Sequence, residues 1–482
     1  MQKRTKILAT IGPASDSVSM IESLVRAGAN AFRMNFSHGT HEYHKENLEK
    51  IKAVEEKLKT RIGIFQDISG PKVRVGELSE MFSLRSGDKL VFVKEKIIGE
   101  RVDEKTYKLC INHPEILALM KEGEYIYLCD GAIRAKVVSA NADIVEAVLE
   151  NSGILTSNKG VNFPNTKLNI DVITDKDERD LEWGARNGVH FVAVSFVQRA
   201  DDILRVKRIL EGFGSKARVF AKIEKFDAVE NIDEIIKVSD GIMVARGDLG
   251  IEVPYYEVPN IQKMIIKKAN EHAKPVITAT QMMLSMTQNE RATRAEISDV
   301  ANAVIDGTDV VMLSEESAVG KHPDKVVEAM CNTIREVEKM YPYYKRFDSH
   351  DETDMVAFST VSLAKDIQAD AILSITGSGK SAIKMARNRP EMTIYAIAHD
   401  EATAHYLTLA WGVEPVMVRD IAPISLLVAD ILNSAYKDGY IDTEKTYVMT
   451  AGFPTGSQGS TNYIRIIKKD QINYYRAIAM EL

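Results

Sequence analysis

The sequence is poor in cysteine and contains no apolar run long enough to cross a bilayer. Its three cysteines, Cys110, Cys129 and Cys331, form no CxxC pair and no zinc-ligand pattern, which excludes a disulfide framework and argues against a zinc site. A transmembrane helix needs about 20 consecutive apolar residues. The N-terminus leads directly into an apolar strand pattern and lacks the features of a signal peptide. These absences predict a cytoplasmic protein that has no membrane partner.

An excess of positive charge is also absent. Lysine and arginine number 62 against 69 aspartates and glutamates, giving a net charge of −7, which argues against a nucleic-acid partner. The composition, 45% hydrophobic and 27% charged, is that of an ordinary globular protein. A chain of 482 residues is too long for one hydrophobic core, so we expect two or three domains.

Short apolar runs alternate with amphipathic stretches over much of the chain. Eight runs have the character of buried strands, at residues 6–11, 31–35, 63–66, 191–195, 219–223, 241–245, 275–278 and 309–313. Helical periodicity follows most of them, as at 17–27, 258–273 and 293–305. Such repetition predicts an α/β fold with a closed (β/α)₈ TIM barrel, whose active site lies on the loops after the strands. An open doubly wound sheet is the alternative, but no GxGxxG motif follows the first strand.

Two further domains interrupt and follow the barrel pattern. Between residues 71 and 172 short β-like runs replace helices, at 89–93, 125–129, 133–138 and 144–149. We expect an inserted small β-barrel domain there that serves as a lid, with the catalytic barrel formed by residues 1–70 and 173–344. Residues 345–482 restart the strand–helix pattern, with strands at 371–375, 393–397, 413–418 and 447–450. They predict a C-terminal open α/β domain.

Charged side chains follow the predicted barrel strands. Lys222 and Glu224 come at the end of the fifth strand, and Asp248 follows the sixth on a glycine-flanked turn. Two acids at one end of a barrel favour Mg²⁺, which needs only one or two carboxylates from the protein. A lysine beside them would act as an anion clamp. Alternatively, Asp248 only caps a helix and Lys222 is a surface charge, an interpretation that weakens as several strand ends converge.

The full charge set at the strand ends suits a phosphate and a metal ion. It consists of four cations and three acids, namely Arg33, Lys72, Arg74, Lys222, Asp67, Glu224 and Asp248. Phosphoryl transfer needs little covalent chemistry and depends on in-line positioning and charge neutralisation. The sequence presents no evident Ser-His-acid set and no HExxH helix. We expect His41 and His44 on the solvated surface rather than at a metal.

Several long motifs resemble the pyruvate kinase family. They occupy residues 6–15, 33–44, 222–224, 240–254, 274–283 and 293–296, and the resemblance extends over the whole chain. It implies a Mg²⁺-dependent transfer of the phosphoryl group from phosphoenolpyruvate to ADP, giving pyruvate and ATP in the last step of glycolysis. It also implies a homotetramer.

The resemblance assigns roles to particular residues. Glu224 and Asp248 would hold Mg²⁺, with Mn²⁺ as a possible substitute, and Lys222 would neutralise the phosphoryl group in transit. Arg33 would contact phosphate and meet the lid through Asp130. The substrate carboxylate would be held by the backbone of Ala245, Arg246 and Gly247 and by Thr280, which also lies near the entering proton. Lys222, Arg33 and Thr280 are thus the catalytic candidates. The nucleotide would contact Pro13, Arg33, Asn35, His38, Tyr43, Arg74 and Lys159.

Two other functions remain open at this point. One is another Mg²⁺-dependent barrel enzyme that uses phosphoenolpyruvate, such as a lyase, although a lyase needs no nucleotide-clamping lid. The other is an inactive relative that senses a nucleotide or sugar phosphate, against which the complete set of Lys222, Glu224 and Asp248 argues.

Two motifs depart from the family pattern, one around Glu315 and one at residues 68–72. Glu315 replaces a common glycine, and the preference of helix starts for anions is its simplest explanation. Many members bind a monovalent cation at positions matching Asn35, Ser37 and Asp67 and carry glutamate where this chain has Lys72. A lysine ammonium is a compact point charge that could replace K⁺ beside Asp67. We therefore expect that K⁺ is not required.

The C-terminal domain contains a glycine- and hydroxyl-rich loop that begins a helix. It fails as a Walker A motif because position 374 is serine. A helix start still offers free N–H groups to phosphate, and the family's effector loop corresponds to it. We expect a phosphorylated metabolite at Thr376, Ser378, Gly379, Lys380 and Ser381, with residues 452–459 facing them. A plain strand-to-helix turn is the alternative.

Overall fold

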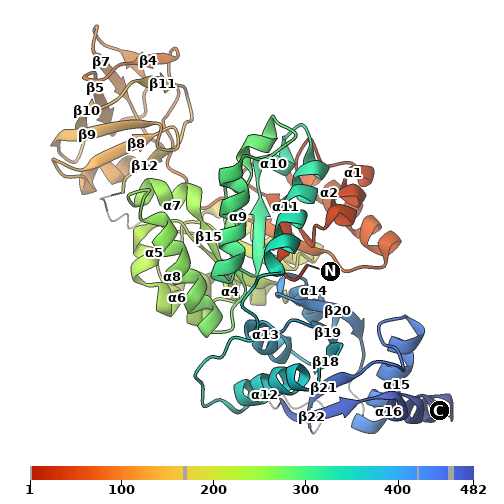
Figure 1. Cartoon of the computed structure of the whole chain (residues 1–482). Helices are drawn as coiled ribbons and strands as arrows, with labels where there is room; N and C mark the ends of the chain where they lie inside the picture. Colours follow the sequence, from red (N-terminus) through yellow and green to blue (C-terminus); the bar gives the residue numbers. More distant parts are fainter. Residues whose placement is uncertain (1–2, 165, 167–170, 421–422, 454–460, 482) are drawn as a thin grey trace.

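The computed structural model describes residues 3–164, 166, 171–420, 423–453 and 461–481 (Figure 1). Eight parallel strands close into a barrel in the order β1-β17-β16-β15-β14-β13-β3-β2. They are β1 (Lys6–Thr10), β2 (Ala31–Asn35), β3 (Gly63–Asp67), β13 (Phe191–Val194), β14 (Arg218–Ile223), β15 (Gly241–Ala245), β16 (Val276–Ala279) and β17 (Val310–Leu313). Every predicted barrel strand is confirmed, with each end within one residue of the predicted position.

The barrel strands are buried because helices cover their outer face and side chains fill the interior. All five residues of β15 are buried, as expected of parallel strands with both faces covered. Three phenylalanines pack inside the barrel, with ring centroids 5.4 Å apart for Phe65 and Phe191 and 5.2 Å apart for Phe65 and Phe220. The interior is therefore a packed core, and chemistry is confined to the rim.

Helices follow the strands and carry the expected capping signals. The Thr293 side chain accepts from Glu296 N–H in a capping box, and Gly307, with φ of 105°, ends the same helix. The barrel helices are α1 (Val18–Ala27), α2 (His41–Leu58), α3 (Asp175–Asn187), α4 (Ala200–Gly212), α5 (Phe226–Glu230), α6 (Ile232–Val238), α7 (Arg246–Glu252), α8 (Val258–Glu271), α9 (Arg294–Asp306), α10 (Glu315–Ala318) and α11 (Pro323–Glu338). A 3₁₀ turn, η2 (Leu284–Thr287), follows β16.

The lid leaves the barrel after β3 and returns before α3 (Figure 1). Its strands surround one apolar core, but their hydrogen bonds divide into a seven-stranded sheet, β12-β8-β9-β10-β5-β7-β6, and the pair β11-β4. These strands are β4 (Phe82–Leu84), β5 (Lys89–Val93), β6 (Glu100–Arg101), β7 (Thr106–Leu109), β8 (Tyr125–Leu128), β9 (Ile133–Ala140), β10 (Ile144–Leu149), β11 (Gly153–Leu155) and β12 (Val161–Asn162). A 3₁₀ helix, η1 (Pro114–Leu119), joins β7 to β8.

The C-terminal domain lies at the end of the barrel opposite to the lid (Figure 1). Its sheet has the order β20-β19-β18-β21-β22, and β22 is antiparallel to β21. The elements are α12 (Glu352–Asp366), β18 (Ala371–Thr376), α13 (Lys380–Arg387), β19 (Thr393–Ala398), α14 (Glu401–Tyr406), η3 (Leu407–Leu409), β20 (Val413–Val418), α15 (Ile424–Lys437), β21 (Tyr447–Gly452), β22 (Thr461–Ile467) and α16 (Lys469–Glu481). Sequence analysis missed β22. The predicted boundaries near 70, 172 and 344 stay predictions.

Within the described ranges, no helix is both long enough and apolar enough to span a membrane.

Candidate active site

The ends of β3, β13 and β14 bring two acids, a lysine and a serine into contact at the barrel rim. Nζ of Lys222 lies 2.7 Å from Oγ of Ser195, 2.8 Å from Oε1 of Glu224 and 3.1 Å from Oδ1 of Asp67. The Lys222 side chain is only 12% exposed. Because parallel strands end at one rim, residues far apart in sequence meet here, as their positions predicted.

This surrounding keeps Lys222 charged. Burial by itself would lower its pKa, but the carboxylates of Asp67 and Glu224 outweigh burial and raise the pKa above its ordinary value. For Asp67 the effects are reversed. Burial by itself would raise its pKa, but the positive charges of Lys222 and Arg33 hold the pKa below its usual range. The rim therefore presents an ammonium group and a carboxylate that are both ionised at neutral pH.

Glu224 is oriented by a strained backbone. Its Oε2 accepts the N–H of Phe196 at 2.8 Å, and Phe196 has φ of 57°, in the left-handed region. Burial raises the pKa of Glu224, and the nearby charge of Asp248 adds to that rise while Lys222 opposes it. A cation bound beside these acids would relieve the repulsion between them.

Two carboxylates fit a hard divalent cation. Among the described residues no group of three or more histidine, cysteine or acidic side chains is arranged to hold a metal. Mg²⁺ needs only one or two carboxylates and takes its remaining oxygen ligands from water and substrate. Glu224 already stabilises a positive charge, that of Lys222, at 2.8 Å. The acids predicted as metal ligands, Glu224 and Asp248, therefore suit Mg²⁺.

Arg33 is held at the rim and not at the lid. Its Nε donates to Oδ2 of Asp67 at 2.6 Å, and a guanidinium nitrogen donates to Oγ1 of Thr10 at 3.2 Å. We predicted that Arg33 would meet the lid through Asp130. In the structure Asp130 pairs instead with Lys72, at 3.7 Å between Nζ and Oδ1. The contact between Arg33 and Asp130 was expected for a closing lid, and it stays a prediction.

The expected position of Lys72 also needs correction. We predicted its ammonium beside Asp67, in the place of a monovalent cation. The charges that neutralise Asp67 are those of Arg33 and Lys222. Lys72 is the cation next to Asp130, at the point where the chain enters the lid. Of the other two cation positions, Asn35 accepts the N–H of Ser37 through Oδ1 at 3.1 Å, and Ser37 is exposed.

Thr280 occupies a strained turn after β16. Its φ is 69°, which costs energy for a β-branched residue and is characteristic of functional sites. Oγ1 of Thr280 accepts the N–H of Gly247 at 2.7 Å and donates to the carbonyl of Ala279 at 2.6 Å. The hydroxyl thus lies at the start of α7, where the backbone of Ala245, Arg246 and Gly247 was predicted to bind a carboxylate.

The Arg246 side chain holds this turn in place. It donates to the carbonyl oxygens of Ala279 at 3.2 Å and Thr280 at 2.8 Å, and it pairs with Asp299 of α9 at 2.7 Å. Sequence analysis assigned only the Arg246 backbone to the site and missed both this side chain and Asp299. Asp299 lies in the helix predicted at 293–305, three residues after the motif at 293–296, so an acid near the rim could have been suspected there.

The residues predicted to bind nucleotide fall into two groups. Pro13, Asn35, His38 and Tyr43 lie at the rim near β1 and β2, with Pro13 and His38 exposed and the Tyr43 hydroxyl donating to Asp16 at 3.3 Å. Arg74 and Lys159 lie in the lid, where Arg74 forms a bridge with Gly160 and donates to the carbonyl of Asn158 at 3.0 Å. That the two groups bind a nucleotide from opposite sides stays a prediction.

The histidines near this rim differ from expectation. We predicted His44 on the solvated surface, but it is 4% exposed, because its ring stacks on Phe36 with centroids 4.0 Å apart. Its Nε2 is bonded to the carbonyl of His38 at 2.9 Å. His41 is partly buried and contacts Asp180 at 2.7 Å. Both side chains are bonded to neighbouring groups of the fold, and the expectation that they bind no metal stays a prediction.

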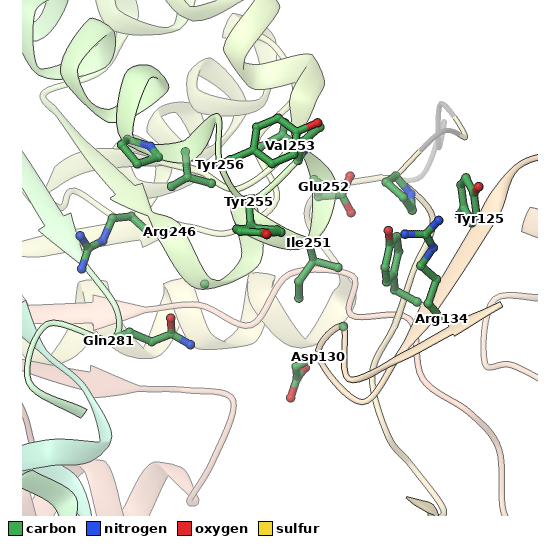
Figure 2. A pocket seen from close by; sticks show the side chains of 18 of the residues that line it. Tyr125, Asp130, Arg134, Arg246, Ile251, Glu252, Val253, Tyr255, Tyr256 and Gln281 are labelled. Atoms are coloured by element: carbon green, nitrogen blue, oxygen red, sulfur yellow. The ribbon is translucent and has the colours of Figure 1, made fainter. Parts of the chain in front are cut away.

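A cavity of about 1030 Å³ opens between the lid and α7 (Figure 2). Tyr125, Asp130 and Arg134 line it from the lid, and Arg246 and Gly247 line it from the barrel. Lys222 and Glu224 are not among the residues that line it. Its volume is at the upper end of the range for small-molecule sites, so a nucleotide-sized ligand could enter beside the strand ends.

The predicted effector loop is only partly accessible. Thr376 and Ser381 are buried, and Oγ1 of Thr376 accepts the N–H of Gly379 at 3.0 Å. Gly379 is buried, Ser378 is half-buried and Lys380 is exposed at the start of α13. Most of the expected opposite loop, 452–459, lies outside the described residues. Glu315 is exposed at the first position of α10, which agrees with the helix-start explanation.

These features define a class of protein. A (β/α)₈ barrel carries an inserted lid, and its strand ends gather two acids, a charged lysine and a strained threonine turn. That arrangement is typical of a barrel enzyme that stabilises developing negative charge.

Comparison with known proteins specifies the family. The model "Pyruvate kinase, barrel domain" matches residues 2–327, and "Pyruvate kinase, alpha/beta domain" matches residues 354–467. The pyruvate kinase of Staphylococcus epidermidis is 40% identical over 476 residues, covering 96% of this chain and 80% of its own length. That of Clostridium acetobutylicum is 38% identical over 475 residues, covering 97% and 99%. The chain therefore belongs to the pyruvate kinase family and is an enzyme.

Proposed function

We propose that this enzyme transfers the phosphoryl group of phosphoenolpyruvate to ADP with the help of Mg²⁺, giving pyruvate and ATP in glycolysis. The observation that carries the proposal is the Lys222 ammonium, kept charged between Asp67 and Glu224 at the barrel rim. A transferring phosphoryl group spreads negative charge over its oxygens, so a fixed buried cation stabilises the transition state more than the ground state.

In the proposed reaction, the bond between phosphorus and the enol oxygen breaks while a terminal oxygen of ADP bonds to phosphorus. Lys222 faces the phosphoryl group and the enolate oxygen left behind. Arg33, fixed by Asp67 and Thr10, contacts the phosphate from the neighbouring strand. Glu224 and Asp248 would hold Mg²⁺, which, when bound, polarises phosphoryl and carboxylate oxygens and neutralises their charge.

Thr280 and the start of α7 complete the substrate site. The N–H of Gly247, now bonded to Oγ1 of Thr280, can turn to the substrate carboxylate. The same hydroxyl then lies close to the enolate, where a proton must be added to carbon to give pyruvate. Arg246 acts as a positioning residue that holds the strained turn at Thr280 in its place beside α7.

ADP would bind between the rim and the lid. Arg74 and Lys159 on the lid supply positive charge for its phosphates, and Pro13, Asn35, His38 and Tyr43 form the opposite wall. None of these residues lines the cavity next to α7, so the proposal rests on their own positions at the rim and in the lid. We extend the proposal to a cytoplasmic homotetramer, which rests on the family resemblance alone.

ATP formation from ADP and phosphoenolpyruvate tests the function directly. We expect turnover with Mg²⁺, partial replacement by Mn²⁺, and loss of activity when the metal is chelated. Phosphoenolpyruvate consumption that does not need ADP would indicate a lyase or another barrel enzyme. Ligand binding without turnover would indicate an inactive sensor.

We further propose that the enzyme does not need K⁺. Asp67, at one of the expected cation positions, is neutralised by Arg33 and Lys222, and the usual glutamate is replaced by Lys72. Activity in tetramethylammonium buffer free of Na⁺ and K⁺ should therefore change little when KCl is added at constant ionic strength. A many-fold rise with K⁺ would contradict the proposal.

We also propose that a phosphorylated metabolite binds the loop before α13. Lys380 is exposed there and Ser378 is partly exposed, so these groups can meet an anion without unfolding the turn. Such coupling typically changes substrate affinity about 5- to 150-fold. A panel of sugar phosphates and nucleoside monophosphates should include one activator, whose effect Lys380→Ala should weaken. If no compound shifts the phosphoenolpyruvate saturation curve, the loop is a plain turn.

A further inference from the structure

A second buried ion pair lies one residue from Glu224, the proposed metal ligand. The Lys225 side chain is 7% exposed, and its Nζ lies 3.8 Å from Oε2 of Glu252, whose side chain is 6% exposed. Breaking a buried pair by removing one partner is strongly unfavourable, because the other charge is left uncompensated. The pair therefore fixes the end of β14 relative to the last residue of α7.

Glu252 also contacts the lid. Nδ2 of Asn162 donates to Oε1 of Glu252 at 3.4 Å, and Asn162 is held in the lid sheet opposite Tyr127 of β8. Gly131, in the turn after β8, packs beside Ile251, the residue before Glu252. Figure 2 shows Ile251 and Glu252 on the side of the α7 segment that faces the lid. The lid thus rests on the C-terminal end of α7.

Helix α7 joins this lid contact to the substrate site. It begins with Arg246, Gly247 and Asp248 and ends at Glu252. Seven helical residues span about 10 Å, so the length of α7 separates the lid contact at Glu252 from the groups proposed to hold substrate and metal.

We propose that Lys225 and Glu252 are positioning residues that, through Asn162, anchor the edge of the lid beside α7, so that the lid turns about this contact as it brings its bound nucleotide to the phosphoryl donor. This inference rests on the proposed function. None of the three side chains contacts the reacting atoms. The set of Lys225, Glu252 and Asn162 is called the latch below.

If the latch positions the lid, its loss should affect one reaction of the enzyme more than another, whereas a purely structural role would affect both alike. Phosphoryl transfer requires the lid and the barrel together. Exchange of the pyruvate methyl protons with solvent is the reverse of the last proton transfer, and it requires only barrel groups such as Lys222 and Thr280. Loosening the latch should therefore slow transfer while leaving exchange nearly unchanged.

The experiment compares the two reactions in the full-length protein with Mg²⁺. In Lys225→Met and Glu252→Gln, kcat/KM for ADP should fall about 10- to 100-fold, because small misplacements of reactants cost that much. Pyruvate deuterium exchange, followed by NMR in D₂O, should stay within about twofold of the parent. Lys225→Arg, which keeps the ion pair, should recover most of the transfer activity. The matched control is Lys268→Met, since Lys268 pairs with Asp233 at 2.5 Å on the barrel exterior.

A double variant keeps the test valid if a single one does not fold. Lys225→Met combined with Glu252→Leu removes both charges, and such apolar replacement of a buried pair is often neutral for stability. It should fold and show the same selective loss of transfer, as should Asn162→Ala to a smaller extent. Parental transfer in the double variant, or transfer and exchange that fall together, would overturn the latch. Absence of transfer in the parent enzyme would instead overturn the proposed function.

Discussion

Replacement of Lys222 by methionine should lower kcat for ATP formation by about 100- to 1000-fold or more. Lys222 is the buried cation that Ser195, Asp67 and Glu224 together hold at the rim. Its charge is fixed before the reaction begins, so stabilising the phosphoryl group requires little reorganisation. Methionine preserves the length of the side chain and removes the charge.

The loss should be confined to chemistry. Arg33 still neutralises Asp67 in Lys222→Met, and Glu224 can accept a proton because burial raises its pKa, so the variant should fold. Phosphoenolpyruvate binding, measured by calorimetry, should persist. Lys216→Met is the control, because Lys216 is an exposed lysine paired with Asp400 at 3.1 Å and far from the rim. Turnover of Lys222→Met within tenfold of the parent would exclude Lys222 as the phosphoryl clamp.

The strands of the barrel could be predicted from sequence because each is an uninterrupted apolar run. β15 illustrates this, since all its residues are buried and its ends are marked by Asp240 and Arg246. β22 was missed because its burial alternates only weakly and it lies at the edge of its sheet, where Asn462 and Arg465 interrupt the apolar pattern. Edge strands with charged residues are common in native sheets and give a weak signal.

Side-chain partners were harder to predict than positions. Because parallel strands end at one rim of a barrel, Asp67, Lys222 and Glu224 could be expected to lie together and to contact one another. Lys72 and Asp130 depend on how far the lid stands from the barrel, which no local pattern determines. His44 was misjudged because its neighbours in sequence are polar, whereas Phe36, which covers it, comes from the preceding loop.

The Arg246 side chain illustrates a further limit. Its partners are carbonyl oxygens of Ala279 and Thr280 on the next strand, and backbone acceptors carry no sequence signature. The positive φ of Thr280 could not be predicted from the sequence either, because threonine does not favour positive φ. Such contacts can be identified only when the strands have been placed side by side.

Replacement of Glu224 by glutamine should mainly raise the Mg²⁺ concentration needed for activity. The substitution keeps an oxygen that can accept the N–H of Phe196, so the strained turn is retained, but it removes the negative charge. Outer-shell changes at metal sites already cost about 10- to 100-fold in metal affinity, so loss of a direct ligand charge should cost at least about tenfold. Asp248→Asn should behave in the same way. The measurement is activity titrated with MgCl₂ at saturating substrates.

Glu315→Gln provides the matched control for this titration. Glu315 is an exposed carboxylate at the start of α10, directly after barrel strand β17, and it should not affect Mg²⁺ dependence. A generic loss of negative charge near the rim would shift both variants alike, whereas loss of a ligand shifts only Glu224→Gln. An Mg²⁺ curve that is unchanged in both Glu224→Gln and Asp248→Asn would remove the two acids as ligands. The charge of Lys222 would then have to be explained by Asp67 and Glu224 alone, as a structural ion cluster at the barrel rim.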